Sequence, residues 1–256
     1  MVATRCHETV TRISTTETMT TEDTLLGGRV RLLQPRRGYR VAVDAVLLAA
    51  AVDSREGERV LDLGAGVGAV GLCLAARVAG CTILGIELQP VLAALAERSI
   101  LLNGMGERLR IVLHDVAQPL PNDLGTFDHV ATNPPYLAAA VADPSPDAIK
   151  ALATVESSAD LARWLGVAIG ALTPAGTITL IHRSDRLEEI VARLDVLGWR
   201  DIAVKPLAPA ARVLVRARRA TTLVRRDLPP LVLHRPEGGY TAEAEAILRG
   251  GQPLAF

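Results

Sequence analysis

The chain has 256 residues, 49% of them hydrophobic, and its 28 basic and 28 acidic residues give a formal net charge of zero. This composition is ample for a sizeable core, and the length fits one large domain or one domain with appendages. A zero net charge excludes a global attraction to nucleic acid or to an anionic membrane. The three cysteines and five histidines lack metal-ligand spacing, and no stretch approaches the roughly 20 apolar residues that span a bilayer. No metal and no membrane association are therefore expected.

Residues 1–24 are rich in Thr and Glu and contain no apolar run of the kind found in a secretory signal. They are predicted to form a flexible tail that is too polar to pack. Residues 25–256 are expected to form one domain, because no repeat or low-complexity linker divides them. Its parts are an N-terminal cap at 25–55, a core at 56–220 and a C-terminal extension at 221–256. A cytoplasmic protein is expected.

Beyond the tail, short apolar strands alternate with helical segments. A strand or hairpin arm is expected at 25–34 and an apolar helix at 43–52. Strands are predicted at 60–63, 82–86, 110–113, 127–131 and 176–181, with helices at 69–78, 90–102, 157–172 and 187–197. Two closing strands at 201–204 and 212–215, an edge strand at 231–233 and a helix at 241–248 follow. This alternation predicts βαβ units, hence an α/β fold with a parallel sheet covered on both faces.

A glycine-rich loop connects the strand at 60–63 to the next helix. Gly64, Gly66 and Gly68 would let a ligand approach the backbone closely. The segment also matches the GxGxxG spacing of a dinucleotide fold, but that frame starts late, at Gly66. Asp62, two residues before the first glycine, can bind an ammonium group and would repel a phosphate. A pyrophosphate ligand is therefore disfavoured.

Acidic residues end the next two strands. Glu87 is suited to accept hydrogen bonds from both hydroxyls of a ribose. Asp115 can accept from an adenine amino group, while Val116 offers its backbone N–H. The carboxyl ends of parallel strands share one edge of the sheet, where open α/β folds bind ligands. A surface acid flanking a helix is the structural alternative for Glu87 alone.

The fourth strand ends abruptly at Asn133-Pro134-Pro135-Tyr136. Prolines cannot continue a strand, so the chain presents an amide, two carbonyls and an aromatic ring. This set can hold a flat NH2-bearing group: the Asn133 oxygen and a proline carbonyl accept its hydrogens, and Tyr136 stacks on its face. A proline-rich turn that merely closes the strand is the alternative for the tetrapeptide alone.

Taken together, Asp62 to Gly68, Glu87, Asp115 and the NPPY turn resemble the class I S-adenosylmethionine-dependent methyltransferases. Residues 24–250 resemble the tRNA1(Val) (adenine-37-N6)-methyltransferase family within that class. The additional features that carry the resemblance are Gln34-Pro35, Gly38-Tyr39-Arg40 through Asp44 to Leu48, Ser145-Pro146, Arg212-Val213-Leu214 and the tail from Leu233 to Thr241. The family implies a Rossmann-like, seven-stranded, mostly parallel sheet whose last strand is antiparallel.

The resemblance also implies roles for residues. S-adenosylmethionine would be the cofactor, with Asp62 and the glycines facing its methionine part, Glu87 its ribose and Asp115 its adenine. Asn133 and the Pro134 carbonyl would hold the target amino group. The implied catalytic residues are Asn133, Pro134, Pro135 and Tyr136; the implied cofactor-binding residues are Tyr39, Asp44, Asp62, Gly64, Gly66, Gly68, Glu87, Asp115, Val116 and Asn133. For Asp44 the alternative is a first-turn acid that stabilises the helix N-terminus.

The expected reaction is N6-methylation of an adenine in the anticodon loop of tRNA, at position 37. The alternatives are a glutamine N5-methyltransferase of peptide-release factors and a guanine-N2 methyltransferase of ribosomal RNA, which also grip an NH2 group. A non-catalytic nucleotide- or RNA-binding module and an NAD-dependent oxidoreductase are more distant readings. The first alternative usually carries a longer helical N-terminal domain than the roughly 55 residues that precede the first sheet strand here.

Arginines gather at two places in the sequence. One group contains Arg29, Arg31, Arg36, Arg37 and Arg40, and the other contains Arg212, Arg216, Arg218, Arg219, Arg225 and Arg226. Such groups are often solvated faces, but two of them flanking one core can form a surface for RNA phosphates. Contact with tRNA is the prediction that follows.

Overall fold

The computed structural model describes residues 19–38, 40–135 and 159–256. Its strands are β1 (Thr20–Leu25), β2 (Val30–Pro35), β3 (Arg59–Leu63), β4 (Thr82–Glu87), β5 (Leu109–Leu113), β6 (Phe127–Thr132), β7 (Leu172–Arg183), β8 (Asp201–Ala208), β9 (Arg212–Arg218), β10 (Val224–Asp227) and β11 (Leu231–Val232). Its helices are α2 (Val43–Ala51), α3 (Ala69–Arg77), α4 (Pro90–Leu102), α6 (Leu161–Gly170), α7 (Leu187–Val196) and α8 (Ala242–Leu248), with short 3-10 turns η1 (Leu26–Gly28), η2 (Asn122–Leu124) and η3 (Ser184–Arg186). The predicted alternation of strands and helices is confirmed.

In the described residues the main sheet has nine strands, in the order β10-β8-β9-β7-β6-β3-β4-β5, with β11 also paired to β8. Strands β3 to β7 are parallel, and β9 runs antiparallel to both of its neighbours, β7 and β8. The predicted seven-stranded sheet with an antiparallel last strand is therefore confirmed. The C-terminal extension adds β10 and β11, both parallel to β8. Strand β11 lies where the sequence predicts an edge strand, whereas β10 was not predicted.

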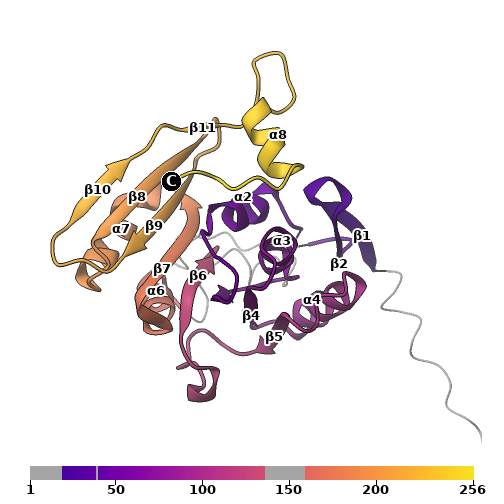
Figure 1. Ribbon diagram of the computed structural model, residues 1–256, viewed down its shortest axis with the longest axis horizontal. Helices are drawn as coiled ribbons and strands as arrows, with labels where there is room; N and C mark the ends of the chain where they lie inside the picture. The colour runs from indigo at the N-terminus through magenta and orange to yellow at the C-terminus, as the bar shows by residue number, and fades with distance from the viewer. Residues whose placement is uncertain (1–18, 39, 136–158) are drawn as a thin grey trace, which may run out of the picture.

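Helices cover both faces of this sheet (Figure 1), and one apolar cluster lies on each face. Successive strand residues face opposite sides: Val60 packs in one cluster with α2, α3 and α4, and Leu61 packs in the other with α6 and α7. Ile83 and Leu84 divide in the same way. Burial on both faces is why these strands read as continuous apolar runs rather than as alternating ones.

The N-terminal hairpin corrects one predicted boundary. Residues 20–24, expected to belong to the tail, form most of β1, which pairs antiparallel with β2 from Thr20 opposite Pro35 to Leu25 opposite Val30. The strand is ordered by backbone pairing and by polar contacts, because Asp23 accepts from the Gln34 amide at 2.9 Å and pairs with Arg40 at 3.0 Å. Composition alone does not show these contacts.

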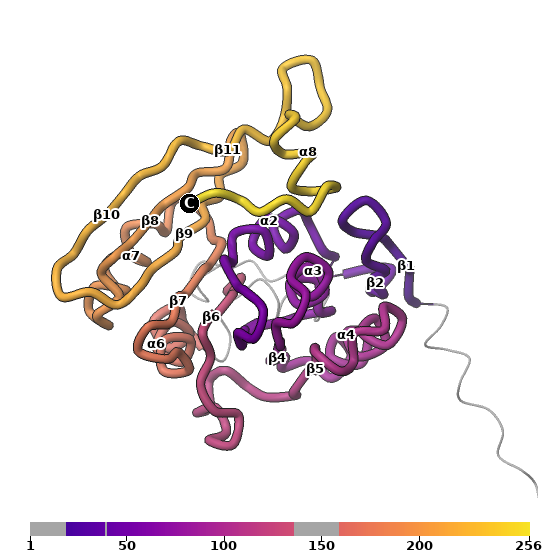
Figure 2. The backbone as a smooth tube through the Cα atoms, in the orientation of Figure 1, coloured from indigo at the N-terminus to yellow at the C-terminus, as the bar shows by residue number. Residues whose placement is uncertain are grey.

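Strand β2 lies beside α4 (Figure 2), and the hydrogen bonds between them show that the two elements run in opposite directions. The Arg31 N–H donates to the side chain of Asn103 at the C-terminus of α4, and the Leu33 N–H donates to Ser99 one turn earlier, each at 2.9 Å. Pro35, at the end of β2, is therefore carried toward the helix N-terminus. That end of α4 follows β4 directly, so the segment after β2 arrives at the carboxyl edge of the main sheet.

The helix predicted at 157–172 begins later and ends earlier than expected. Asp160 is its N-cap and accepts from the Arg163 N–H at 2.8 Å, so α6 starts at Leu161. It ends at Gly170, and β7 begins at Leu172. An Asp at the N-cap satisfies a backbone donor that the first turn otherwise leaves unpaired.

Candidate functional site

The predicted site residues meet because four neighbouring strands end side by side. Leu63 of β3 is paired with Ile86 of β4 on one side and with Thr132 of β6 on the other. Beyond β4, Glu87 is paired with Leu113 of β5. Along the carboxyl edge the order is therefore the Asn133 turn, the glycine loop, the acid at the end of β4 and the Asp115 turn. This confirms their predicted location at one edge of the sheet.

The glycine loop is anchored to the neighbouring strand. The backbone N–H groups of Gly64 and Ala65 both donate to the Ile86 carbonyl, at 2.9 and 2.8 Å. Gly64 has φ +82°, and a Cβ atom on it would lie 2.8 Å from Cζ2 of Trp164. Only glycine fits this position, because the conformation is left-handed and a ring covers the α-carbon.

Asp62 lies beneath the loop rather than in the open. Its side chain is buried, 2% exposed, and one carboxylate oxygen accepts from the Gly71 N–H in the first turn of α3 at 3.2 Å. Burial raises the pKa of Asp62 to about 7, although the Gly71 hydrogen bond acts in the opposite direction. Asp62 thus joins β3 to α3, and in this arrangement it serves the loop's conformation.

Replacing Asp62 with Asn is expected to stabilise the protein progressively as the pH rises from 4 to 7. The pKa of Asp62 is raised on folding, from 3.8 to about 7, so in that window the folded carboxyl holds a proton that the unfolded one has lost. Ionisation of Asp62 therefore leaves the free energy of unfolding unchanged below pH 4. Above pH 7 it lowers that free energy most, by on the order of 4 kcal/mol. Asn keeps an oxygen for the Gly71 N–H and cannot ionise. Urea unfolding at pH 4 to 8 measures the difference in free energy of unfolding between Asp62→Asn and the unaltered protein, with the exposed Asp123→Asn as control. A difference that does not depend on pH would contradict the assignment.

Glu87 also faces the glycine loop. It is 6% exposed, and its two oxygens accept from the backbone N–H groups of Gly66 and Gln89, each at 2.8 Å. Burial raises the pKa of Glu87, while these hydrogen bonds lower it. At the end of the adjacent strand, β5, Asp115 accepts from the Ala117 N–H at 2.9 Å, and Val116 is buried. The edge therefore carries carboxylate acceptors held in place by backbone donors.

The Asn133-Pro134-Pro135 segment follows β6 directly, and Asn133 is half-buried. Tyr136 lies outside the described residues. His182 is fully buried near the end of β7, and the backbone of Pro135 is close enough to influence the pKa of its imidazole. Burial is the largest influence and lowers the pKa of His182 to about 4, against the effect of Pro135. The His182 imidazole is therefore neutral at physiological pH.

Asp44 stands in the first turn of α2, as predicted, and its carboxylate pairs with the Arg212 guanidinium at 3.2 Å. Arg212 lies opposite Arg183 at the end of β7, so this ion pair is also at the carboxyl edge. Ahead of it, the buried Gln34 accepts from the Val41 N–H at 2.9 Å and fixes the segment that leads into α2. Tyr39 lies outside the described residues.

Sequence reasoning missed three residues at this edge: Thr132, Arg163 and Trp164. The Arg163 guanidinium donates twice to the Ala117 carbonyl, at 2.9 and 3.2 Å, and thereby fixes the turn after Asp115. Trp164 covers Gly64 and donates to the Thr132 hydroxyl at 2.7 Å. No local motif announces them, because their partners lie 32 to about 100 residues away in the sequence.

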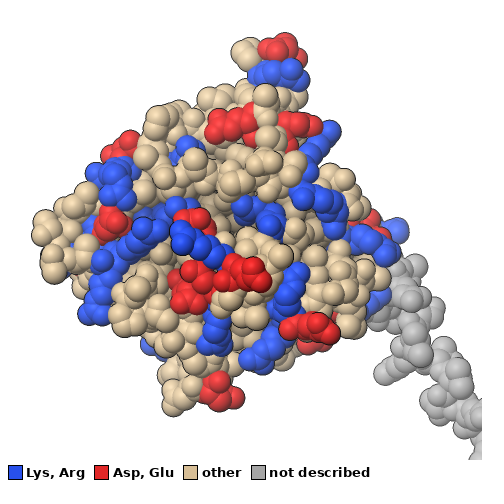
Figure 3. Space-filling view, viewed as in Figure 1, with Lys and Arg blue, Asp and Glu red and all other residues tan. Residues whose placement is uncertain are grey.

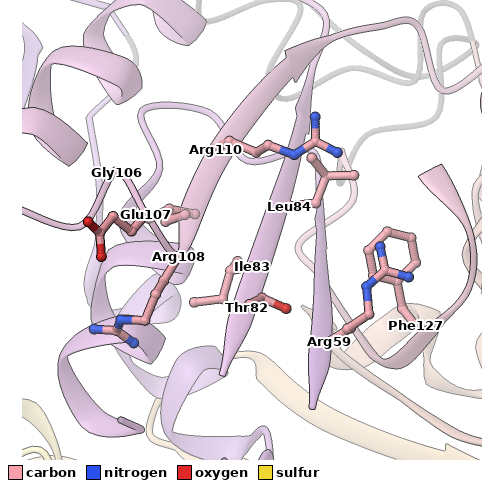
Figure 4. A pocket seen from close by; sticks show the side chains of 10 residues that line it. Arg59, Thr82, Ile83, Leu84, Gly106, Glu107, Arg108, Arg110 and Phe127 are labelled. Atoms are coloured by element: carbon pink, nitrogen blue, oxygen red, sulfur yellow. The ribbon is translucent and has the colours of Figure 1, made fainter. Parts of the chain in front are cut away.

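The pocket in Figure 4 lies at the opposite, amino edge, where β3, β4, β5 and β6 begin. It has a volume of about 180 Å³ and includes Arg59, Arg108 and Arg110. Arg59 donates to the Leu124 carbonyl at 2.7 Å and lies over the Phe127 ring, and Arg108 donates to two carbonyls at the end of α3. Arg59 and Arg108 are therefore engaged in contacts within the fold. The pocket contains none of the predicted site residues.

The arginine groups are divided by the fold. Several members are paired with acids: Arg31 with Glu22, Arg40 with Asp23, Arg225 with Glu188 and Arg226 with Asp201. On the face shown in Figure 3, basic and acidic side chains are interspersed rather than gathered in one patch. Arg36 and Arg37, after β2, are exposed, and within the described part of the chain their side chains make no hydrogen bond or ion pair.

No described helix combines the length and the apolar composition needed to cross a membrane. In the described ranges, no three His, Cys, Asp or Glu side chains gather in a way that could hold a metal ion.

Comparison with known proteins identifies relatives over most of the chain. Residues 40–156 match the family described as the methyltransferase small domain. The chain is 30% identical to the tRNA1(Val) (adenine(37)-N6)-methyltransferase of Yersinia pestis, over 81% of this chain and 85% of that protein. It is 31% identical to the protein of the same name from Tolumonas auensis, over 65% of this chain and 68% of that protein.

Solved structures share the fold. A predicted O-methyltransferase from Agrobacterium tumefaciens superposes with a TM-score of 0.66 and 25% identity, over 83% of this chain and 99% of that one. The 16S rRNA N2 G1207 methyltransferase of Thermus thermophilus, solved with AdoMet and guanosine, gives 0.55 at 21% identity, over 78% of this chain and 50% of that one. The fold is that of class I methyltransferases, and by the extent and identity of its sequence matches the chain belongs to the tRNA1(Val) (adenine(37)-N6)-methyltransferase family.

Proposed function

We propose that the protein transfers a methyl group from S-adenosylmethionine to N6 of an adenine in tRNA, at position 37 of the anticodon loop, in the cytoplasm. The observation that carries the proposal is the pairing of Leu63 with Thr132, which sets the glycine loop beside the turn that begins at Asn133. Family membership supports the choice of tRNA, since the relatives carry that activity in their names.

The hydrogen-bonding groups along the carboxyl edge fit S-adenosylmethionine. The two carboxylate oxygens of Glu87 suit the two ribose hydroxyls, and Asp115 with the Val116 N–H suits the edge of an adenine. The Glu87 carboxylate, which faces the glycine loop, opposes a phosphate ligand. Gly64, Gly66 and Gly68 would border the methionine part, and Tyr39 and Asp44 would close the site from the N-terminal side. When bound, the cofactor supplies a methyl group on a positively charged sulfonium.

The role of the Asn133 turn is to hold and aim the target nitrogen. An adenine N6 lone pair is delocalised into the ring and is a poor nucleophile. The Asn133 side-chain oxygen and the Pro134 carbonyl would accept its two hydrogens and favour a tetrahedral nitrogen, with Pro135 fixing the turn and Tyr136 stacking on the base. Positioning and electrostatics then account for the rate, and the proton leaves after transfer without an assigned general base.

The target base must leave its stack to reach this turn. Single-stranded RNA loops present bases that proteins splay out and stack on aromatic side chains. Stacking on Tyr136 would offset part of the unstacking cost, which amounts to a few kcal/mol. An anticodon loop meets this requirement better than a duplex.

Arg36 and Arg37 are the arginines best placed to contact tRNA phosphates. Replacing both with alanine is expected to weaken tRNA binding at low salt about tenfold. It should also reduce the slope of log affinity against log salt by about 1.5, since each lost phosphate contact contributes roughly 0.7 to 0.9. Both residues are exposed at the end of β2, which reaches the carboxyl edge.

The matched control is Arg218→Ala with Arg219→Ala, which removes the same charge from the amino edge. Arg218 lies opposite Thr177 and Asp201, far along β9 from Arg212. Filter binding across a salt series measures both double variants. Equal losses in the two variants would show a general charge effect, and salt-independent binding of the unaltered protein would exclude a phosphate-contact surface.

The function is tested by methyl transfer from radiolabelled S-adenosylmethionine to tRNA, ribosomal RNA and a peptide-release factor in parallel, with mass spectrometry of the product. N6-methyladenosine in tRNA is the expected result. Label on a release-factor glutamine or on an rRNA guanine would replace the proposal with the corresponding alternative. Cofactor binding without any transfer would indicate a binding module.

A further inference from the structure

A side-chain hydroxyl adds a second connection to the backbone pairing that joins the two halves of the candidate site. Thr132, the last residue of β6, is fully buried, and its hydroxyl donates to the Leu63 carbonyl at 2.7 Å. The same oxygen accepts from the indole N–H of Trp164, also at 2.7 Å. Leu63 precedes the glycine loop and Thr132 precedes Asn133, so this hydrogen bond joins the residues from which the two loops begin.

Trp164 is itself held on two sides. Asp160 caps the helix that carries it, and the neighbouring Arg163 is bonded to the Ala117 carbonyl. Its ring lies so close to Gly64 that a Cβ there would be 2.8 Å from Cζ2. The first turn of α6 therefore contacts both the glycine loop and the turn after Asp115. Because Trp164 is packed against Gly64, a displacement of Thr132 would disturb this contact.

We propose that Thr132 and Trp164 are positioning residues for methyl transfer, whose hydrogen bond fixes the separation between the glycine loop and the Asn133 turn. The proposal rests on the proposed function and names residues that act through others. Transfer requires donor and acceptor loops held within a fraction of an ångström, and a misplacement of about 1 Å can cost a hundredfold in rate. A rigid bond at the roots of both loops supplies that constraint.

Two conservative variants test the couple. Thr132→Val removes the hydroxyl and keeps the shape, and Trp164→Phe removes the indole N–H and keeps an aromatic side chain at this position. Each is expected to lower kcat for tRNA about tenfold while the KM for S-adenosylmethionine changes less than threefold. If the two residues act through one hydrogen bond, kcat of the double variant is no lower than kcat of the more impaired single variant. Multiplication of the two losses to about a hundredfold would overturn the proposal.

Thr179→Val is the matched control. Thr179 lies on the adjacent strand, opposite Ala131, is 1% exposed, and in the described structure its hydroxyl has no hydrogen-bond partner. The same chemical change at this site should leave kcat and KM unaltered. A loss equal to that of Thr132→Val would mean that any buried Thr→Val change in this sheet impairs the enzyme, and would also overturn the proposal.

Fluorescence gives a readout that does not depend on transfer. The chain has two tryptophans, so Trp199→Phe leaves Trp164 as the sole indole emitter. In that background Thr132→Val is expected to shift the tryptophan emission of the unliganded protein to the blue. Addition of S-adenosylhomocysteine is also expected to change the emission, and calorimetry verifies that the ligand binds. No response to either would overturn the proposal. A responsive protein that methylates no tRNA would instead refute the proposed function while supporting the coupling.

Discussion

Replacing Asn133 with alanine is expected to lower kcat for tRNA methylation about a hundredfold to a thousandfold while the Kd for S-adenosylmethionine changes less than about threefold. The amide oxygen is the side-chain acceptor proposed for the target amino group, and preorganised groups that act on the reacting atoms commonly contribute a hundredfold to a thousandfold. Cofactor binding should persist, because the loop and acids proposed to hold it lie on β3, β4 and β5. Radiolabel transfer and calorimetry measure the two quantities separately.

Two further variants sharpen this prediction. Asn133→Asp keeps an acceptor oxygen and should retain more activity than Asn133→Ala, because the proposed role is acceptance of N–H groups. Asn122→Ala, in the exposed turn η2, makes the same truncation away from the site and should leave both quantities unchanged. Equal losses of transfer and cofactor affinity in Asn133→Ala would contradict the division of roles between this turn and the glycine loop.

The edge that carries these groups could be predicted because its signals are local. Each strand reads as an apolar run that stops at a distinctive residue, such as Glu87 or Asn133, and parallel connections bring such ends to one side of the sheet. The structure confirms that arrangement through the register of β6, β3, β4 and β5. The position of the candidate site is therefore predictable from the sequence.

The elements that were missed depend on distant partners. Strand β10 has the sequence Val-Arg-Arg-Asp, which has little apolar character, and it exists because β8 offers an edge from Asp201 to Val204. Strand β1 is polar and is ordered by Asp23 and its partners. Strand propensity is largely a measure of packing context, so neither strand has a local signature.

Within the site, orientation was harder to predict than location. Asp62 was expected to face a ligand, yet its carboxylate bonds to the Gly71 backbone and is almost fully buried. The contact of Trp164 with Gly64 and Thr132 joins residues that no spacing rule relates. A sequence identifies which residue types are available at an edge, whereas hydrogen bonding and packing decide which of them face outward.

Replacing Glu87 with glutamine is expected to raise the Kd for S-adenosylmethionine about a hundredfold, although the change is nearly isosteric. Both carboxylate oxygens accept from backbone N–H groups, of Gly66 and Gln89. A glutamine NH2 would set a donor against one of these donors and would leave one acceptor fewer for the two ribose hydroxyls. Losing charge-assisted hydrogen bonds of 1.5 to 3 kcal/mol corresponds to roughly a tenfold to hundredfold loss each.

The proposed contact with ribose makes a specific prediction for ligands. S-adenosylhomocysteine, which has the same ribose, should lose affinity for Glu87→Gln as strongly as S-adenosylmethionine does. Its 2′-deoxy analogue should bind the unaltered protein weakly and should lose less affinity on Glu87→Gln than the parent does, because one of the two hydroxyls that would donate to the carboxylate is already missing. Glu97→Gln, on the exposed side of α4, is the control for the substitution itself. If the deoxy analogue lost as much affinity as the parent, Glu87 would act through the Gly66 loop conformation and not through the ribose.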